Sequence, residues 1–464
     1  MSSELRTLWE HAGGRLPESC EIVPLESLLR DSKGIAVGVM YPGPDTAGGV
    51  PLIKVGDIDR GVIPARPSYC ISAETNHEYR RTQLDGDELL ITLVGNPGEC
   101  VVVTPEMRSW NPARAIAVIR LRDTGLRTYM KAVLESAAGK HLIDAVLNTT
   151  VQKTLNLKDI RRLPIPLPSR ATIKGISDLS NALTGRIAIL LQSNATLEAI
   201  TRALFKSWFV DFDPVRAKQQ GLAPTGMDEA TAATFPSDFQ ESALGLVPKG
   251  WECIDLAALT KRFGGSIQTG PFGSQLHASD YVDSGVPVVM PKDIVNRRVS
   301  TYSVARIGTV DAERLSRHKL QAGDIVFSRR GDVERHALVT QREIGWLCGT
   351  GCLLLRPGST WKSPGFLSML LDAPRARTWL VQHAVGATMP NLNTGILGSV
   401  PVVLPSLSVL RAFEDLISVT EQQRSRNASM AETLAGVRET LLPRLISGQL
   451  RLPEAAVQIS ETTT

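Results

Sequence analysis

The chain has 464 residues, of which 43% are hydrophobic and 21% charged, and its formal net charge is +4. At about 150 residues per domain this length predicts two to four domains, and the composition excludes a disordered chain and a small disulfide-stapled scaffold. No apolar run approaches the roughly 20 residues of a bilayer span, and no apolar signal segment follows Met1–Arg6. We therefore expect a cytoplasmic protein that makes no contact with a membrane.

Six cysteines are spread along the chain, and in a cytoplasmic protein of this length we expect free thiols. Only Cys348 and Cys352 are close in sequence. Their spacing could supply two metal ligands, but no second pair with ligand spacing accompanies them. We therefore predict no metal site and interpret the two cysteines as buried residues of a strand.

The most informative feature is an internal repeat of about 237 residues. Four pairs of segments carry it, all at almost the same offset. They are Pro51–Ile58 with Pro287–Ile294, Gly86-Asp87 with Gly323-Asp324, Leu155-Asn156 with Leu392-Asn393, and Leu163–Ser169 with Val400–Ser406. Low identity between the copies indicates one fold that carries different surface loops.

Each copy begins with short strands. Leu89–Val94, Cys100–Thr104 and Ala115–Leu121 are rich in β-branched residues, and Gly, Pro, Asn and Asp separate them, which predicts strands joined by turns. Thr128–Ala138 and Phe366–Leu371 favour a few helices among them. Each copy therefore predicts a mixed α/β head.

A long helix is expected after each head. Apolar residues recur at helical spacing in the proline-free segment 171–213, and the pattern returns at the equivalent place in the second copy. Leu190, Leu197 and Leu204 are seven residues apart, which is coiled-coil spacing, so we expect the two helices to pair. A helix of about 40 residues is roughly 60 Å long and could hold two heads apart. The alternative is two ordinary core helices of separate domains.

Two heads held apart by a rigid helix pair suit recognition of duplex DNA, because each head could read a short sequence while the bases between them go unread. Between Pro287 and Arg342 the chain has 11 basic and 6 acidic side chains. A solvated charged surface is the alternative interpretation of this excess.

The loops after the repeated strands hold the candidate DNA contacts, because Arg or Lys reads guanine, Asn or Gln reads adenine, and any basic group can bind phosphate. In the first head the candidates are Lys54, Arg60, Arg66, Arg80, Arg81 and Asn96. In the second head they are Ser274, Gln275, Lys292, Arg297, Arg298, Arg329, Arg330 and Arg335. Arg329-Arg330 is the preferred pair, and surface solvation is the alternative for each residue.

Several segments resemble the specificity subunits of type I restriction-modification systems. They are Phe205–Lys218, Leu441–Leu450, Gly270–Ser274, Gly323–Arg329, Gly95–Gly98 and Asn391–Asn393. Together with the two-copy layout, the resemblance covers nearly the whole chain. The first head departs from the pattern at its opening, where Gly34–Gly38 stands in place of a Gly-Pro-Phe-Gly motif.

The resemblance implies an α+β fold, in which two similar α/β target-recognition domains are separated by a pair of long antiparallel coiled-coil helices with a pseudo-twofold internal repeat. The expected boundaries are 1–168 and 248–405 for the two target-recognition domains, 169–213 and 406–450 for the two spacer helices, 214–247 for a linker, and 451–464 for a disordered tail.

The resemblance also implies a DNA-binding subunit without catalytic residues, each of whose heads reads one half of a bipartite target. Two modification subunits would methylate adenine with S-adenosylmethionine, and restriction subunits would translocate and cut DNA with ATP and Mg²⁺, so this chain would hold no cofactor. The sequence lacks methyltransferase, phosphate-loop and zinc-protease motifs, which agrees with a subunit that has no catalytic residues. The alternatives are an enzyme that modifies or cleaves DNA alone and a repeat-built scaffold that binds protein.

Apolar side chains near the helix ends are candidates for a subunit interface. They are Phe205, Trp208, Phe209, Leu441 and Leu445. Such side chains are too apolar to remain in water, so they either close the helix pair or anchor a modification subunit. Packing within the chain is the alternative, because Leu445 takes the place of Trp208 in the second copy.

Overall fold

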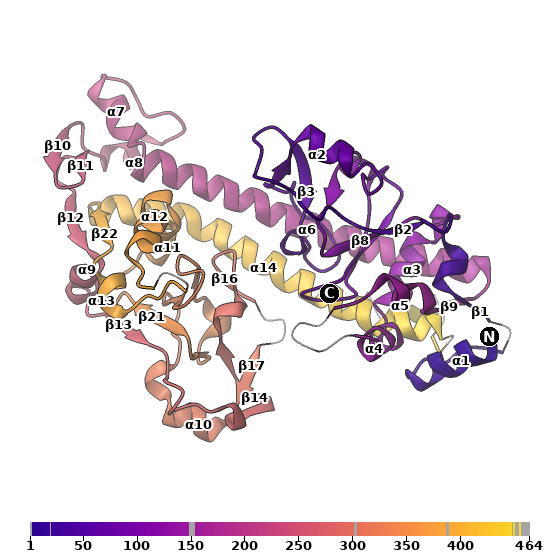
Figure 1. Cartoon of the computed structure of the whole chain (residues 1–464). Coiled ribbons are helices and arrows are strands. Elements are labelled where there is room, and N and C mark those ends of the chain that lie inside the picture. The colour runs from indigo at the N-terminus through magenta and orange to yellow at the C-terminus, as the bar shows by residue number, and fades with distance from the viewer. Residues whose placement is uncertain are drawn as a thin grey trace. The chain divides into compact units, whose positions relative to one another are not determined.

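The computed structural model describes residues 2–18, 20–147, 154–300, 304–386, 389–447, 449–450 and 454–455. The chain divides into two compact units (Figure 1): the first comprises Met1–Leu197 and Gln423–Thr464, and the second comprises Glu198–Gln422. Each unit contains one head and parts of two long helices, α6 (Arg170–Phe209) and α14 (Leu407–Ile446). Among the described residues, none of the helices combines the length and apolarity that a membrane crossing requires.

The first head contains nine strands and five helices among its described residues. The strands are β1 (Glu21–Pro24), β2 (Ile35–Val37), β3 (Val50–Ile53), β4 (Cys70–Ile71), β5 (Leu89–Thr92), β6 (Cys100–Val102), β7 (Asn111–Pro112), β8 (Ile116–Ile119) and β9 (Pro164–Leu167). The helices are α1 (Ser2–His11), α2 (Ala73–Glu78), α3 (Arg127–Leu134), α4 (Ala137–Ala145) and α5 (Leu157–Arg162). One sheet has the order β2-β8-β5-β6, another has the order β4-β3-β7, and β1 pairs with β9.

The second head has the same kinds of element. Its strands are β12 (Glu252–Asp255), β13 (Ser266–Thr269), β14 (Tyr281–Val289), β15 (Ile294–Val295), β16 (Arg298–Val299), β17 (Ala305–Ile307), β18 (Ile325–Ser328), β19 (His336–Leu338), β20 (Leu347–Cys348), β21 (Cys352–Arg356) and β22 (Pro401–Leu404). Its helices are α9 (Leu256–Arg262), α10 (Thr309–Arg314), α11 (Pro364–Asp372), α12 (Pro374–His383) and α13 (Thr394–Gly398).

The two heads share one topology. The sheet β13-β21-β18-β19 corresponds strand for strand to β2-β8-β5-β6, the sheet β17-β14-β20 to β4-β3-β7, and the pair β12-β22 to β1-β9. The register is also repeated, because Leu89 lies opposite Ile119 and, at the equivalent place in the second copy, Ile325 lies opposite Leu355. The structure therefore confirms the predicted repeat and the mixed α/β fold of each copy.

The central strands are apolar throughout because both faces of the sheet are covered. Successive side chains of a strand point to opposite faces. Leu89 and Ile91 accordingly join the cluster that contains Tyr129 of α3, whereas Leu90 joins the cluster on the other face, which contains Ile53 of β3. This two-sided burial explains why β5 reads as a continuous apolar run rather than an alternating one.

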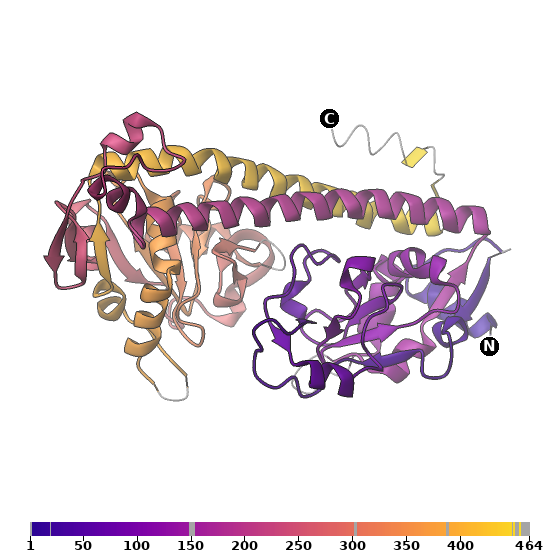
Figure 2. The ribbon, with the colours of Figure 1, turned by 90° about the horizontal axis from the view of Figure 1, so that it is seen from above.

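The helices α6 and α14 run antiparallel in each unit (Figure 2). In the first unit, Ile187 packs in one cluster with Ala431, and Asn194 bonds with Asn427. In the second unit, the rings of Phe205 and Phe413 have centroids 6.1 Å apart. Each helix has 40 residues, and α14 begins one repeat length after α6. The predicted pairing of two long helices is thus confirmed.

Polar side chains occupy part of the helix contact, where the sequence predicts a leucine stripe. Asn427 Nδ2 donates to Asn194 Oδ1 at 2.9 Å, and Asn194 Nδ2 donates to the carbonyl oxygen of Arg424 at 3.1 Å. Leu190 is buried, but Leu197 and Leu204 are only half-buried. The heptad spacing therefore describes only part of the contact between the helices.

The segment 214–247, predicted as a linker, contains local structure. It includes most of α7 (Asp213–Gln219), then α8 (Glu229–Ala233) and a hairpin of β10 (Phe239–Ser242) with β11 (Gly245–Pro248). Phe235 is buried against Trp208, with ring centroids 5.1 Å apart. The sequence of this segment lacks a helical period of apolar residues because its helices and strands are too short to produce one. Of the predicted tail 451–464, only 454–455 fall within the described residues.

Candidate nucleic-acid interface

Five of the six candidates in the first head are exposed. Arg66, Arg80 and Arg81 have exposed side chains. Lys54 follows β3 and lies with its Nζ 3.3 Å from the centroid of the Tyr69 ring. Asn96 lies in the turn after β5, where its Nδ2 donates to Glu99 at 3.2 Å. These side chains are accessible to a ligand.

Arg60 differs, because it is directed to the helix α14. Its Nη2 lies 3.1 Å from a carboxylate oxygen of Glu432, and its carbonyl oxygen accepts a bond of 3.3 Å from Arg438. The backbone of Arg60 is left-handed, with φ 53°, as at the first central position of a type I′ hairpin turn. The turn therefore directs this arginine to the helix α14, and its contact with DNA stays a prediction.

Arg297 occupies the corresponding hairpin turn of the second head, and it is also paired within its unit. Its Nη2 lies 2.8 Å from Glu198 of α6, its Nε lies 3.6 Å from Asp372, and its Nη1 donates to Ser368 at 3.2 Å. The side chain is only 10% exposed. Arg298, the next residue, forms an ion pair with Glu421 of α14. Both arginines thus pair with carboxylates of the long helices, and their contact with DNA stays a prediction.

The remaining candidates of the second head lie in surface loops. Ser274, Gln275, Lys292, Arg330 and Arg335 are exposed, and Arg329 is half-buried. Arg335 pairs with Asp332 in its own loop, and Gln275 accepts a bond of 3.2 Å from the amide of Phe272. Arg329 and Arg330 follow β18, and neither has an ion pair with a long helix of the kind that Arg297 and Arg298 form.

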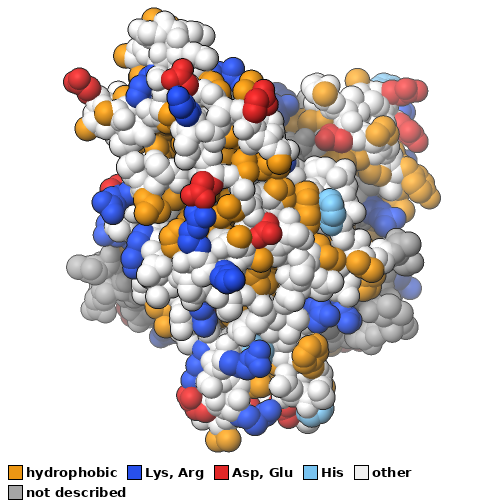
Figure 3. Space-filling model, turned by 90° about the vertical axis from the view of Figure 1, so that its left-hand side faces the viewer, with side chains coloured by type: hydrophobic (Ala, Val, Ile, Leu, Met, Phe, Trp, Pro, Cys, Tyr) orange, Lys and Arg blue, Asp and Glu red, His pale blue; other side chains and the backbone are white. Residues whose placement is uncertain are grey.

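Basic side chains do not form one continuous patch on the face shown in Figure 3. Lys and Arg are dispersed there among hydrophobic and acidic side chains. The partners of each arginine decide whether it can bind a ligand.

Around the candidate Arg329, sequence reasoning missed two polar side chains, Thr350 and Asn391. Arg329 Nε, Thr350 Oγ1 and Asn391 Oδ1 are buried and have no hydrogen-bond partner in the part of the chain that the structure describes. Asn391 belongs to Asn391–Asn393, one of the segments that resemble specificity subunits. The repeat could have drawn attention to Thr350, because its counterpart in the first head is Arg114.

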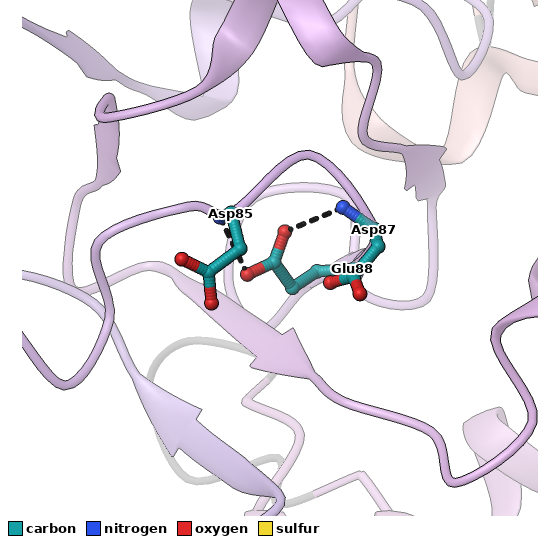
Figure 4. A group of neighbouring side chains, drawn as sticks. All are labelled: Asp85, Asp87 and Glu88. Atoms are coloured by element: carbon teal, nitrogen blue, oxygen red, sulfur yellow. Dashed lines mark hydrogen bonds between the residues drawn. The ribbon is translucent and has the colours of Figure 1, made fainter.

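The first head holds a cluster of three carboxylates, Asp85, Asp87 and Glu88, with oxygens within 4.8 Å of one another (Figure 4). Glu88 is buried and accepts bonds from the amides of Asp85, Gly86 and Asp87 at 2.9 to 3.1 Å. Arg120 lies 3.1 Å from the same carboxylate. These contacts assign Glu88 to closing the turn before β5, and Arg356 with Asp324 repeats the pair in the second head at 2.7 Å.

The apolar residues predicted for a subunit interface lie inside the chain's own cores. Phe205, Trp208 and Phe209 are buried in the second unit, where the Phe209 ring centroid is 4.9 Å from those of Phe366 and Phe413. Leu441 and Leu445 are buried in the core of the first unit. The interface prediction disagrees with this burial, because the chain covers these side chains itself.

Cys348 and Cys352 are buried free thiols in β20 and β21, which confirms the interpretation as buried strand residues. A hydrogen bond with Cys348, together with burial, raises the pKa of Cys352 well above its ordinary value.

The chain is similar to known specificity subunits. The HindI specificity subunit of a type I restriction enzyme from Haemophilus influenzae is 28% identical over 362 residues, which cover 69% of this chain and 74% of that protein. The EcoBI specificity subunit from Escherichia coli is 29% identical over 155 residues, which cover 33% of this chain and 32% of that protein. No family model matches the chain.

A solved structure is similar along most of the chain. The S subunit of a type I restriction-modification system from M. genitalium is matched over 93% of this chain and 97% of that one, with 14% identity and a TM-score of 0.44. The sequence similarity to the Haemophilus protein is longer than one repeat, so it includes parts of both copies.

Proposed function

We infer that this chain is a specificity subunit of a type I restriction-modification system, which binds double-stranded DNA and reads a bipartite target with one half-site for each head. The observation that carries this proposal is the similarity over 362 residues to a type I specificity subunit. The shared topology of the heads supports it, because one frame with different loops suits two different half-sites.

The chemistry of methylation and cleavage belongs, in this proposal, to partner subunits. Two modification subunits would methylate adenine with S-adenosylmethionine, and restriction subunits would use ATP and Mg²⁺. This chain would hold no cofactor and supply no catalytic residue; its part is to place those subunits at one DNA sequence. Because its proposed target is the DNA of the host or of a phage, we propose that it acts in the cytoplasm.

Exposed apolar residues on the two long helices are the surface that we propose for the modification subunits. In the second unit these are Ile200 of α6 and Leu416 and Val419 of α14, which are 46%, 46% and 69% exposed. Apolar side chains on a solvent-facing helix surface indicate a contact with another protein. They replace the buried aromatic residues that the sequence suggested for this contact.

The deciding experiment maps adenine methylation across the host genome with and without this gene, while the modification subunit is kept in both strains. We expect one two-part motif with an unread spacer to lose its methylation in the deletion strain and to regain it when the gene is restored. An identical set of methylated motifs in both strains would contradict the proposal.

A further inference from the structure

Three segments meet at an equivalent junction in each head. In the second head, the amide of Arg329 donates to the carbonyl oxygen of Gly351 at 2.8 Å, and the amide of Leu392 donates to the carbonyl oxygen of Arg329 at 2.9 Å. A backbone bridge joins Arg330 to Asn391. The junction thus combines the end of β18, the loop before β21 and the loop before α13.

The first head has the same backbone contacts at the equivalent positions of the repeat. The amide of Leu93 donates to Ala115 at 2.7 Å, the amide of Leu155 donates to Leu93 at 2.9 Å, and a bridge joins Val94 to Thr154. The same three segments therefore form the same junction. Its side chains differ at all three positions, because Leu93, Arg114 and Thr154 take the places of Arg329, Thr350 and Asn391, and one positive charge moves to another segment.

That charge is an arginine supplied from different segments. In the second head, Arg329 follows β18 and Thr350 lies in the loop before β21. In the first head, Leu93 takes the place of Arg329, and Arg114 takes the place of Thr350. The second head thus has Arg329, with Arg330 next to it, after the strand β18, whereas the arginine of the first junction, Arg114, comes from the loop before β8.

Within the described residues neither arginine has a side-chain hydrogen bond or ion pair; the side chain of Arg114 is exposed, whereas Arg329 is half-buried and its Nε is buried without a partner. A half-buried guanidinium without an acceptor is costly, since burial removes water and nothing replaces it. This contrasts with Arg297 and Arg298, whose charges meet carboxylates. The unpaired state of Arg329 therefore indicates a ligand that brings acceptor atoms.

The neighbours of Arg329 indicate the kind of ligand. Asn391 Oδ1, an acceptor, and Thr350 Oγ1, which can donate or accept, are also unpartnered at this junction. A phosphate has acceptors only, whereas a G·C pair presents the O6 and N7 acceptors of guanine beside the N4 donor of cytosine in the major groove. Arg329 as donor and Asn391 Oδ1 as acceptor match the acceptors of guanine and the donor of cytosine. Side chains often rotate when a protein binds its partner, which would let both groups reach the base pair.

The junction of the second head borders an exposed surface. Arg330 is exposed beside it, and Met389 is 62% exposed on the segment that leads to Asn391. The amide of Gly331 donates to the carbonyl oxygen of Pro390 at 3.0 Å, which holds these two segments together. A DNA duplex on this surface would place Arg330 near the backbone while Arg329 faces a base edge.

We propose that this junction is the base-reading subsite of each head, where Arg329 reads the guanine of a G·C pair in one half-site and Arg114 reads a guanine in the other. The proposal rests on the proposed function of the chain as a DNA-specificity subunit. It assigns the difference between the two half-sites partly to the exchange of one arginine between two segments of a common frame.

The test is selection of duplexes from a randomised library by the full-length chain with its modification subunits, followed by sequencing. The variants are Arg329→Leu and Arg114→Thr, each of which introduces the residue that the other head has at that position. Because the repeated junction already accommodates those residues, we expect both variants to fold, and far-ultraviolet circular dichroism checks this. Arg262→Ala is the control, since Arg262 is exposed, pairs with Glu252 and is not among the candidate DNA contacts.

We expect Arg329→Leu to reduce the preference for G·C at one position of one half-site by about 10-fold or more, and to leave the other half-site unchanged. Arg114→Thr should do the same in the other half-site, and Arg262→Ala should change neither. Equal loss of affinity for all sequences would indicate a phosphate contact and overturn the proposal, as would an unchanged motif. If the unaltered chain selects no bipartite motif, the proposed function itself fails, which this design distinguishes.

Discussion

The two heads bury a cation at the same place but supply it from opposite sides. In the first head, Lys131 of α3 lies 2.7 Å from Glu135, donates to the carbonyl oxygen of Gly61 at 3.3 Å, and also contacts the carbonyl oxygen of Cys100. Gly61 lies in the hairpin turn after β3. A Cβ atom at Gly61 would overlap the ammonium nitrogen, so the lysine needs a glycine there.

In the second head the hairpin turn supplies the cation. Arg297 takes the place of Gly61 in the repeat, and its guanidinium lies near Asp372 and Ser368 of α11. Asp372 is the counterpart of Glu135, and Ser368 is the counterpart of Lys131. The short serine leaves the space that the arginine fills.

The comparison teaches that the repeat preserves an arrangement of charge rather than particular residues. In both heads the carboxylate also meets an arginine of a long helix: Arg438 lies 3.8 Å from Glu135, and Arg202 lies 3.0 Å from Asp372. Burying a carboxylate without a neighbouring cation lowers the stability of the fold. If one position of the repeat loses its cationic side chain, another position therefore has to supply a cation. Three experiments follow from this difference.

The largest effect is expected from Lys131→Met. This change removes the cation whose side chain is 2% exposed and leaves Glu135 with the amide of Cys100 and with one cation, Arg438, at the longer distance of 3.8 Å. We expect a loss of about 3–5 kcal/mol in the free energy of unfolding, measured by urea titration. Lys140→Met is the matched control, because its pair with Glu439 is exposed and should contribute less than about 1 kcal/mol. Similar losses in both variants would contradict the assigned role of Lys131.

A smaller loss of stability, which arises from one histidine of the second head, is expected when the pH is lowered. His336 stacks on Phe327 and lies 3.0 Å from the carbonyl oxygen of Ser368, and burial lowers its pKa to about 4. The folded chain then binds fewer protons than the unfolded chain below the ordinary pKa of 6.5, so stability is lost as the pH falls from about 6.5 toward 4. Between pH 7 and pH 5 the loss should be about 2 kcal/mol.

The first head has Cys100 at the position that corresponds to His336. His336→Cys should therefore remove this part of the pH dependence, as measured by urea titration at both pH values. A variant that retains the full dependence would show that other groups cause it.

The smallest effect is a rescue that sharpens the comparison. Lys131→Ser combined with Gly61→Arg gives the first head the arrangement of the second. We expect the double variant to recover about 1 kcal/mol relative to Lys131→Ser alone, because the new guanidinium can reach Glu135. The recovery is partial, since a Cβ at Gly61 would lie 2.9 Å from the carbonyl oxygen of Cys100. No recovery in thermal or urea unfolding would mean that the two arrangements are not interchangeable.

Much of the fold could be predicted from the sequence because its signals are local or periodic. The offset between Pro51–Ile58 and Pro287–Ile294 predicted two copies, and the proline-free apolar pattern predicted α6. The short elements between α6 and the second head escaped prediction, because α8 has only five residues and shows no periodicity.

The candidate site could be predicted only in part, because partners distant in sequence decide which arginines are accessible. Arg297 and Arg329 both lie in loops of the same basic segment. Glu198, which neutralises Arg297, lies 99 residues away, and no local pattern connects the two. Trp208 likewise needs Phe235 and Phe413 to be covered. The sequence alone therefore could not predict which of these side chains the fold covers.

The core of the first unit has a consequence for synthesis of the chain. Leu441 and Leu445 of α14 lie in the same core as Trp9 and Tyr129, although the whole second head separates the two pairs in sequence. A ribosome that has completed the first head has not yet made the helix that covers it. The first unit therefore stays open until the second has been translated, and a chain that ends before α14 exposes apolar surface that proteases and chaperones recognise.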